Sequence, residues 1–319
     1  MRETIRRMRR WLLLVVLLAG CGDEPRPAVE GRLPGASTSR TCEAAGDFWP
    51  TMVLARSADV TWVACKEQLR VVGSDGTRIE LDGPPIALLA AFDALWALDA
   101  DSTLYRLEDG RVESRLALGL QAPYNLWAGA DTLWVADDQA GEVVRIDPGG
   151  AVRARIGVGD GPSGMAFDGT TAWVVNHRDR GLWEIDTRTD RARRVATLEG
   201  DAPERIALLD GELWITGRGT DLLRVEPRDG RVLETVEIGG GGIDVVAGDG
   251  ALWVPARSVA VDATGLPTLD ALRRVVPGRA PTVVTRPRGR TDVHGLLADE
   301  GGIWLADTTN GYVYRFANP

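Results

Sequence analysis

Short apolar runs separated by turn residues recur along almost the whole chain, and none of them has a helical period. The clearest copy extends from Gly161 to Gly200, where residues 163–167, 171–176, 181–186 and 192–198 form four such runs. Asp168-Gly169 separates the first two runs, and Asp-Gly is favoured in two-residue hairpin turns because both central positions need positive φ. This stretch therefore predicts four short antiparallel strands.

The same unit is repeated along the chain, and each copy carries a tryptophan in its second run. These residues are Trp62, Trp96, Trp134, Trp173, Trp214, Trp253 and Trp304, with successive spacings of 34, 38, 39, 41, 39 and 51 residues. A period near 40 residues with four strands is typical of a propeller blade. In four copies a proline stands eleven residues before the tryptophan, at the entry to strand one, where no ladder donor is needed: Pro85, Pro123, Pro162 and Pro203. We expect the tryptophans to pack between blades.

The pattern predicts an all-β fold, a seven-bladed β-propeller with four-stranded antiparallel blades over residues 42–319. The last copy supplies only three strands, at residues 294–298, 303–307 and 312–316. We expect a segment between residues 28 and 41 to provide the fourth strand and to cover the open sheet edge.

The N-terminus differs from the repeats, because several arginines precede an apolar run over residues 11–19 that is too short to span a bilayer. The run ends in Leu18-Ala19-Gly20-Cys21, which resembles the lipobox of bacterial lipoproteins. The resemblance implies that residues 1–20 are a cleaved signal and that lipidated Cys21 anchors the protein at the cell envelope. An ordinary cleaved signal with an incidental cysteine is the alternative. Residues 21–41 are rich in proline and glycine and indicate a tether.

The charge balance argues against a nucleic-acid partner. The whole chain has a net charge of −9, and without residues 1–20 it has 32 basic and 45 acidic residues, a net charge of −13. Such a surface repels nucleic-acid phosphates and anionic lipid headgroups. We expect an extracytoplasmic monomer attached to the membrane by its lipid.

The two remaining cysteines, Cys42 and Cys65, are expected to form a disulfide in an oxidising compartment. In a four-stranded meander the entry to strand one and the exit from strand two lie on one face, so a bridge between them is geometrically reasonable. Two buried free thiols are the alternative.

A family resemblance lies in the repeat itself. The run from Gly161 to Gly169 (GPSGMAFDG), followed by Ala172-Trp173-Val174, resembles the repeat of virginiamycin B lyase-like propellers, and YVTN and NHL propellers are similar. The lyases of that family cleave a cyclic peptide antibiotic with channel histidines, a glutamate and a magnesium ion. The resemblance therefore implies that such residues would lie around the central channel. Val293-His294-Gly295-Leu296 resembles the Pro-His-Gly-Ile of that family and places His294 at a catalytic-type position.

The lyase machinery is incomplete in this chain. The only histidines are His177 and His294, and the preceding blade has Asp244 near the position where the lyases carry their second histidine. A neutral histidine that caps a strand is the alternative for His294. We expect no cofactor and no metal.

Strand-one entries and strand-two exits converge on one face of a propeller, so the predicted ligand-binding residues lie there. They are Tyr124, Asn125, Glu204, Arg205, Asp244, His294 and Asp307; Asp99, Asp137, Asn176 and His177 occupy further strand-two exits. A solvated channel mouth with internal ion pairs is the alternative. An insertion of about ten residues near 257–270 adds a loop to this face. The opposite face is expected to consist of tight Asp-Gly hairpins that offer little shape for a ligand.

The sequence thus favours a lipid-anchored binding or scaffold module for a protein, peptide or small ligand. A degenerate lyase or hydrolase that uses the His294 rim is the second hypothesis.

Overall fold

The computed structural model describes residues 37–40, 42, 54–57, 59–219, 221–242, 244–261, 267–287, 293–307 and 311–317, all within one compact unit that spans Gly31–Pro319. The predicted signal over residues 1–20, the predicted lipidation site Cys21 and the tether up to residue 36 lie outside the described residues. Within the described part, no helix is long and apolar enough to span a membrane.

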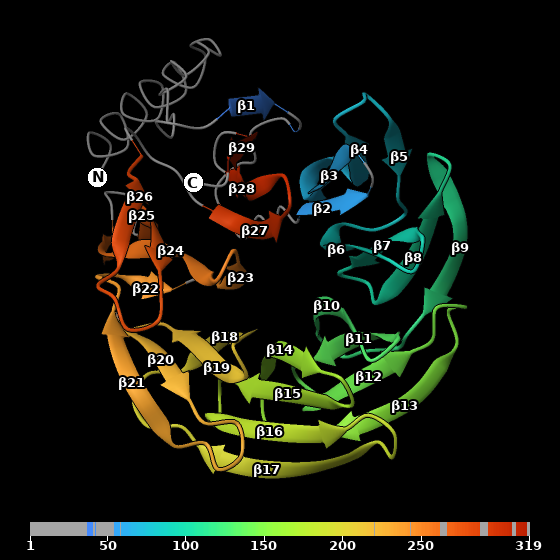
Figure 1. Cartoon of the computed structure of the whole chain (residues 1–319). Helices are drawn as coiled ribbons and strands as arrows, with labels where there is room; N and C mark the ends of the chain where they lie inside the picture. Colours follow the sequence, from blue (N-terminus) through green and yellow to red (C-terminus); the bar gives the residue numbers. More distant parts are fainter. Residues whose placement is uncertain are drawn as a thin grey trace, which may run out of the picture. The chain divides into compact units, whose positions relative to one another are not determined.

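Seven antiparallel sheets are arranged in a ring, with the first strand of each repeat innermost (Figure 1). Blade 1 contains β2 (Leu54–Ser57), β3 (Val60–Cys65), β4 (Arg70–Gly73) and β5 (Arg78–Glu80). Blade 2 contains β6 (Pro85–Ala91), β7 (Ala94–Asp99), β8 (Thr103–Glu108) and β9 (Arg111–Ala117). Blade 3 contains β10 (Pro123–Gly129), β11 (Thr132–Asp137), β12 (Glu142–Ile146) and β13 (Val152–Gly157). Blade 4 contains β14 (Pro162–Asp168), β15 (Thr171–Asn176), β16 (Gly181–Asp186) and β17 (Arg191–Thr197). Blade 5 contains β18 (Pro203–Leu209), β19 (Glu212–Gly217), β20 (Asp221–Val225) and β21 (Val232–Glu237). A short 3-10 turn, η1 (Lys66–Gln68), follows β3. The predicted seven-bladed propeller is confirmed.

The local predictions hold closely in blade 4. Strands β15 and β16 cover residues 171–176 and 181–186 as expected. The predicted Asp168-Gly169 turn lies one residue further along, because Asp168 still pairs with Thr171 at the end of β14 and Gly169, with a φ of 55°, begins the turn. The four repeat prolines are the first residues of β6, β10, β14 and β18. Proline is tolerated there because the strand has only begun and no ladder donor is needed.

The ring closes in blade 7, which contains β27 (Val293–Asp299), β28 (Gly302–Asp307) and β29 (Tyr312–Phe316). Strand β1 (Ser37–Arg40) pairs antiparallel with β29, with Ser37 opposite Arg315 and Arg40 opposite Tyr312 (Figure 1). The predicted closing strand from the N-terminal segment is confirmed. It removes an open edge at which another strand would otherwise pair.

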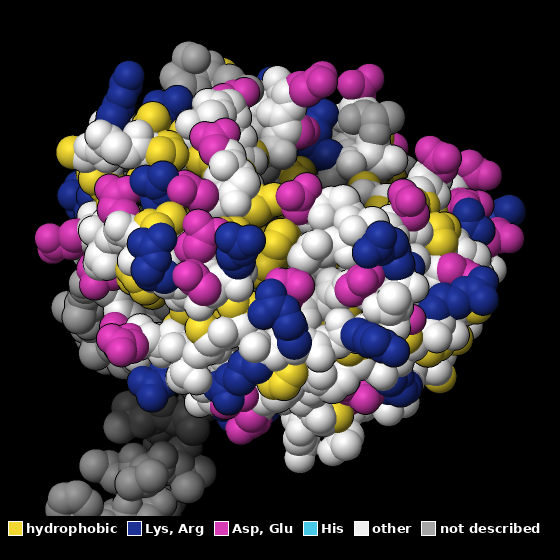
Figure 2. Space-filling view, turned by 60° about the horizontal axis from the view of Figure 1, so that its bottom comes forward, with side chains coloured by type: hydrophobic (Ala, Val, Ile, Leu, Met, Phe, Trp, Pro, Cys, Tyr) yellow, Lys and Arg dark blue, Asp and Glu magenta, His cyan; other side chains and the backbone are white. Residues whose placement is uncertain are grey.

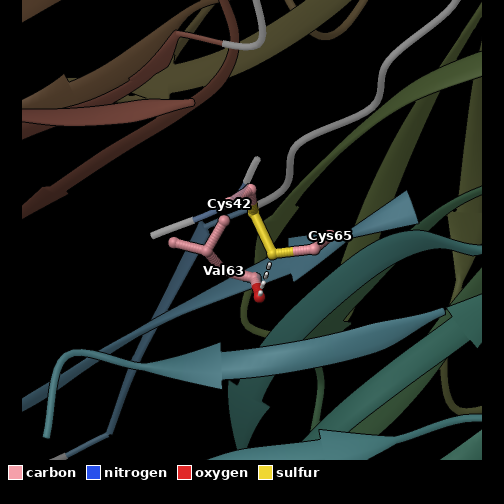
Figure 3. The surroundings of a disulfide bond; sticks show 3 residues. All are labelled: Cys42, Val63 and Cys65. Carbon is pink, nitrogen blue, oxygen red and sulfur yellow. Dashed lines mark hydrogen bonds between the residues drawn. A yellow bond between two sulfur atoms is a disulfide. The ribbon is translucent and has the colours of Figure 1, made fainter. Parts of the chain in front are cut away.

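The predicted disulfide is also present. Cys42 and Cys65 are joined by an S–S bond of 2.01 Å and are both buried (Figure 3). Cys42 lies two residues beyond β1, whereas Cys65 ends β3. The bond therefore ties the strand that closes blade 7 to blade 1.

Blade 6 departs from the prediction. It contains β22 (Gly241–Gly242), β23 (Val246–Gly248), β24 (Ala251–Val261), β25 (Pro267–Val275) and β26 (Thr282–Thr285). The extra residues lengthen two paired strands, with Arg257 opposite Leu269 and Val261 opposite Pro267. The expectation of a loop over residues 257–270 is therefore wrong for the described part of that range. The pairing is irregular between Arg257 and Val261, and residues 262–266 lie outside the description.

The core is distributed between neighbouring blades. Trp134 is fully buried against Met165 and Val174 of blade 4, and Trp214 is fully buried against Val254 and other apolar residues of blade 6. The indole N–H of Trp134 is satisfied locally, because its Nε1 donates to the carbonyl of Gly129 at 3.0 Å, whereas the buried Nε1 atoms of Trp173 and Trp214 have no hydrogen-bond partner among the described residues. The structural role expected of the tryptophans is confirmed.

Charged residues of both signs alternate on the surface. Figure 2 shows basic and acidic side chains intermixed on the face in view, and many form cross-strand pairs, such as Arg155 with Glu142 at 2.6 Å. Because neighbouring strands carry opposite charges, the excess negative charge does not gather into a single acidic patch on that face.

Candidate functional site

The predicted convergence of strand ends is present. Strand-one entries pair with strand-two exits, as in Pro162 opposite Asn176 and Val293 opposite Asp307. We call the side of the ring formed by these ends the entry face. The turns between strands one and two, and between strands three and four, lie on the other side, which we call the hairpin face.

Arg205 connects three blades on the entry face. It is half-buried near the start of β18, and its Nη1 lies 3.3 Å from the hydroxyl of Tyr124, 3.1 Å from the carbonyl of Ser163 and 2.9 Å from the carbonyl of Glu204. Its guanidinium carbon lies 5.2 Å from the centre of the Tyr124 ring. Gly164 permits this approach, because a Cβ there would lie only 3.0 Å from the Arg205 Cα. Arg205 is thus a fixed cation beside an aromatic ring.

The charge of Arg205 is stabilised by its surroundings. Burial acts to lower the pKa of its guanidinium, but Tyr124, Asp244 and Glu204 together raise that pKa above the usual value. Glu204 also accepts a hydrogen bond of 2.7 Å from Arg218 Nε, which raises the pKa of Arg218. Both arginines therefore stay protonated at any physiological pH.

A second polar group also lies beside Tyr124. His177 Nε2 lies 2.7 Å from Asp138 Oδ1, and Arg178 donates to Asp138 Oδ2 at 2.8 Å and to Asp160 Oδ1 at 2.6 Å. The Tyr124 and His177 rings are stacked, with centroids 6.3 Å apart and an interplanar angle of 21°. Tyr124 therefore joins an arginine and a histidine–carboxylate pair across blades 3, 4 and 5.

The carboxylates at the strand-two exits are buried inside the blades instead of facing the rim. Asp137 Oδ2 accepts from the amide of Gln121 at 2.7 Å, and its Oδ1 accepts from that of Ala122 at 3.0 Å. Asp99 accepts from the hydroxyl of Tyr105 at 2.8 Å. Asn176 is likewise fully buried, and its Nδ2 donates to the carbonyl of Val158. These residues therefore secure the connections between strands.

Asp307, a predicted ligand-binding residue, follows the same pattern. Its side chain is fully buried and its Oδ2 accepts from the hydroxyl of Tyr314 at 3.3 Å. The prediction that the Asp307 carboxylate faces the rim is wrong, because the side chain points into blade 7. Side chains alternate between the two faces of a strand, so the next residue along is the one that turns outward. This alternation would have identified Asp138, which the sequence interpretation missed.

The other predicted residues are placed individually. Asn125 lies at an irregularity of β10, where its Oδ1 accepts from the amide of Leu126 at 2.9 Å. Asp244 Oδ1 accepts from the amide of Val245 at 2.9 Å, and its charge contributes to the raised pKa of Arg205. The backbone of His294 belongs to β27, but its side chain lies outside the description.

The described part of the chain shows no metal-binding cluster, and a small cavity lies next to this site. Among those residues, no group of three or more histidine, cysteine, aspartate or glutamate side chains is arranged to hold a metal ion. A cavity of about 80 Å³ lies between blades 4 and 5, beside Pro203 and Gly217. Small-molecule pockets usually enclose roughly 300–1,000 Å³, so the cavity is too small for a ligand by itself.

Comparison with known proteins supports the fold alone. No protein-family model and no curated protein sequence matches this chain. Virginiamycin B lyase from Staphylococcus aureus has a similar structure, with 15% sequence identity and a TM-score of 0.71 over 89% of this chain and 99% of that chain. A chain of the mitotic checkpoint complex is 17% identical, with a TM-score of 0.72 over 94% of this chain and 97% of that chain. BamB from Moraxella catarrhalis is 12% identical, with a TM-score of 0.61 over 89% of this chain and 97% of that chain. The resemblance to virginiamycin B lyase-like propellers is therefore confirmed for the architecture.

Proposed function

We propose that this protein is a lipid-anchored, extracytoplasmic propeller that binds a peptide, protein or small ligand at its entry face, through an anionic group held by Arg205. The observation that carries the proposal is the free edge of this guanidinium. Nη1 makes all the hydrogen bonds that Arg205 donates to described residues, so Nε and Nη2 remain available. A carboxylate binds such an edge with two parallel hydrogen bonds.

The surroundings of Arg205 suit a ligand with mixed polarity. The stacked rings of Tyr124 and His177 lie beside the cation and contribute apolar atoms. Asp138 and Glu204 place carboxylates around it, although each already accepts hydrogen bonds from arginine. A peptide with a free carboxylate matches this arrangement, since the cation holds the acid group and the rings pack against apolar atoms.

Two features support the cellular location. The Cys42–Cys65 disulfide is typical of proteins from oxidising compartments. The basic N-terminus and the Leu18-Ala19-Gly20-Cys21 motif match a lipoprotein signal. One structural neighbour is a chain of the mitotic checkpoint complex, so this architecture also occurs in a protein named as part of an assembly.

The test is affinity capture from solubilised cell envelopes with three forms of the lipidated protein. We expect wild-type protein and Arg153→Ala, which changes an exposed arginine on the outer strand β13, to capture the same partner. Arg205→Ala should lose it. Equal capture by all three forms would reject Arg205 as the binding residue.

The second candidate is a degenerate lyase, favoured by the position of His294 on β27 and by the fold shared with virginiamycin B lyase. One such structure is of a catalytically inactive variant of that lyase with quinupristin, which makes quinupristin a direct probe. Turnover of quinupristin by wild-type protein that disappears in His294→Ala would support the enzyme. No turnover, together with capture that depends on Arg205, would support the binding module.

A further inference from the structure

An arginine covers the repeat tryptophan in most blades. In five of them the residue opposite the tryptophan on strand three is arginine, with its guanidinium carbon 5.2–5.9 Å from the indole centroid. These pairs are Trp96–Arg106, Trp134–Arg145, Trp214–Arg224, Trp253–Arg274 and Trp304–Arg315. The repeat therefore contains a binding position for a guanidinium on an indole face.

Arg145 shows what else such a guanidinium contacts. Besides Trp134 of its own blade, its Nη1 donates to the carbonyl of Thr187 at 2.5 Å and to Asp190 Oδ1 at 2.8 Å. Both acceptors lie in the β16–β17 turn of the next blade. The arginine therefore fills the space between one blade's tryptophan and the outer hairpin of its neighbour.

Blade 1 lacks this arginine. Trp62 stands opposite Gly73, which has no side chain to place over the ring, and Trp62 is only half-buried. None of the described arginines lies over Trp62. A cleft of about 400 Å³ opens there, between blades 1 and 2 on the hairpin face. The expectation that this face offers little shape is wrong at this point.

The walls of this cleft correspond to the contacts of Arg145. They include Trp62, together with Glu108, Asp109 and Gly110 from the β8–β9 turn of the next blade and Asp93 from its β6–β7 turn. The β8–β9 turn of blade 2 is equivalent to the β16–β17 turn that Arg145 reaches in blade 4. Blade 4 also lacks the arginine, since Glu184 stands opposite Trp173, but Trp173 is only 7% exposed. Of the two blades that lack this arginine, the one with glycine opposite its tryptophan leaves the indole more exposed.

We infer that the Trp62 cleft binds the arginine side chain of a partner polypeptide, which would occupy the place that the chain's own arginine fills in five other blades. The guanidinium would stack on the indole face of Trp62 and approach Asp93 and Asp109, which are exposed. Glu108 already pairs with Arg106, so the two aspartates are the free carboxylates of the turns. This site lies on the face opposite Arg205 and is independent of the function proposed for it.

The test uses the disulfide-bonded protein without its signal and Nα-acetyl-arginine amide as the probe, observed by saturation-transfer NMR. Nα-acetyl-citrulline amide has nearly the same shape without the charge. We expect saturable binding of the arginine derivative and at least about fivefold weaker binding of the citrulline derivative, because the carboxylates are partly solvated. Equal binding of both probes, or no saturable binding of either, would overturn the inference.

Matched double variants locate the site. Asp93 and Asp109 both have positive φ, at 56° and 47°, which asparagine also tolerates. Asp93→Asn with Asp109→Asn should weaken binding about fivefold or more. Asp210→Asn with Asp249→Asn makes the same change at φ values of 52° and 51° in blades 5 and 6, and should leave binding unchanged. Equal effects of the two double variants would show that only net charge matters and would reject the cleft.

The variant Gly73→Arg should fill the Trp62 cleft with an arginine side chain of the protein itself. A Cβ at this position would lie 2.5 Å from Asp75 Oδ1 and 3.0 Å from Trp62 Cζ3, so the exposed Asp75 side chain must move. The folded variant, verified by its circular dichroism and melting curve, should no longer bind the arginine derivative. Retained binding by that folded variant would contradict the inference. Arg205→Ala should bind the probe normally, which separates a failure at this cleft from a failure at the entry face.

Discussion

The guanidinium of Arg205 lies over the ring of Tyr124, 81 residues earlier in the chain, with 3.3 Å between Nη1 and the phenolic oxygen. The two residues belong to β18 of blade 5 and β10 of blade 3, so the contact passes over blade 4. It is possible because the innermost strands approach one another at the centre of the ring, where Gly164 leaves room. The hydrogen bonds of Arg205 to described residues all involve Nη1, and we propose that the edge formed by Nε and Nη2 binds a ligand.

Arg205→Lys should weaken ligand capture while keeping the positive charge. Lysine is a compact point charge and does not present two parallel donors to a carboxylate, so the expected loss is about 1–3 kcal/mol of binding free energy. The dissociation constant of the captured partner measures it. Arg153→Lys on the outer strand β13 is the control and should have no effect. Full affinity in Arg205→Lys would mean that charge alone suffices at this position.

Removal of the disulfide should lower the free energy of unfolding by about 3 kcal/mol, because the bond closes a loop and ties β1 to blade 1. Cys42 and Cys65 are 23 residues apart in sequence. Denaturant unfolding of wild-type protein with and without reductant measures the effect. The double variant Cys42→Ser with Cys65→Ser should match the reduced protein and should not respond to reductant. A variant as stable as oxidised wild type would show that the blade interface closes the ring by itself.

Asp137→Asn should destabilise the fold by about 1–3 kcal/mol, because a buried acceptor of backbone amides would be replaced by a group that also donates. Asp137 accepts hydrogen bonds from the amides of Gln121, Ala122 and Ala140. Chemical denaturation measures the change, and Asp210→Asn at an exposed turn is the control. A loss of stability confined to Asp137→Asn would establish these carboxylates as structural. An unchanged stability would reopen a role at the rim.

Alkaline stability should depend on Tyr105. Burial and, after it, the hydrogen bond to Asp99 raise the pKa of Tyr105 from 10.0 to about 12. Because the folded pKa is raised, the unfolded chain loses this proton first, and the contribution of Tyr105 to stability is present below pH 10 and is lost as the pH rises toward about 12. Between these pH values the free energy of unfolding, measured by chemical denaturation, should fall more steeply with rising pH for wild type than for Tyr105→Phe. The same pH dependence of the free energy of unfolding in both proteins would contradict the role assigned to Tyr105.

Cys21→Ala should release the protein from the membrane and leave a precursor that is uncleaved or cleaved incorrectly, because the lipid anchor is attached to this cysteine in the proposal. Fractionation of cells and labelling with a radioactive fatty acid measure both effects. The variant with Cys42→Ser and Cys65→Ser keeps Cys21 and should remain lipidated. Labelled, membrane-bound Cys21→Ala protein would remove the lipoprotein proposal.

Much of the architecture follows from local sequence. Asp-Gly turns, the spacing of the tryptophans and the prolines at strand entries act over a few residues, and they predicted the blades, the closing strand and the face on which strand ends converge. The loop expected near residues 257–270 was wrong because an insertion count does not reveal whether the added residues pair with one another, as Arg257 and Leu269 do.

Side-chain direction at the rim was harder to predict. Asp307 and Asp138 both stand at strand-two exits, but Asp307 turns into its blade toward Tyr314, whereas Asp138 turns out toward His177. A carboxylate at a rim position is compatible with either direction, and only the neighbouring donors decide between them.

The sequence by itself therefore determined the repeat unit, its number of copies and its turns, because these depend on backbone geometry and on apolar periodicity within each copy. Only the tertiary structure decided which side chains meet between blades. The contact between Arg205 and Tyr124 and the uncovered face of Trp62 beside Asp109 both arise where different copies approach each other. Such contacts depend on the twist and spacing of packed sheets, and no short stretch of sequence encodes them.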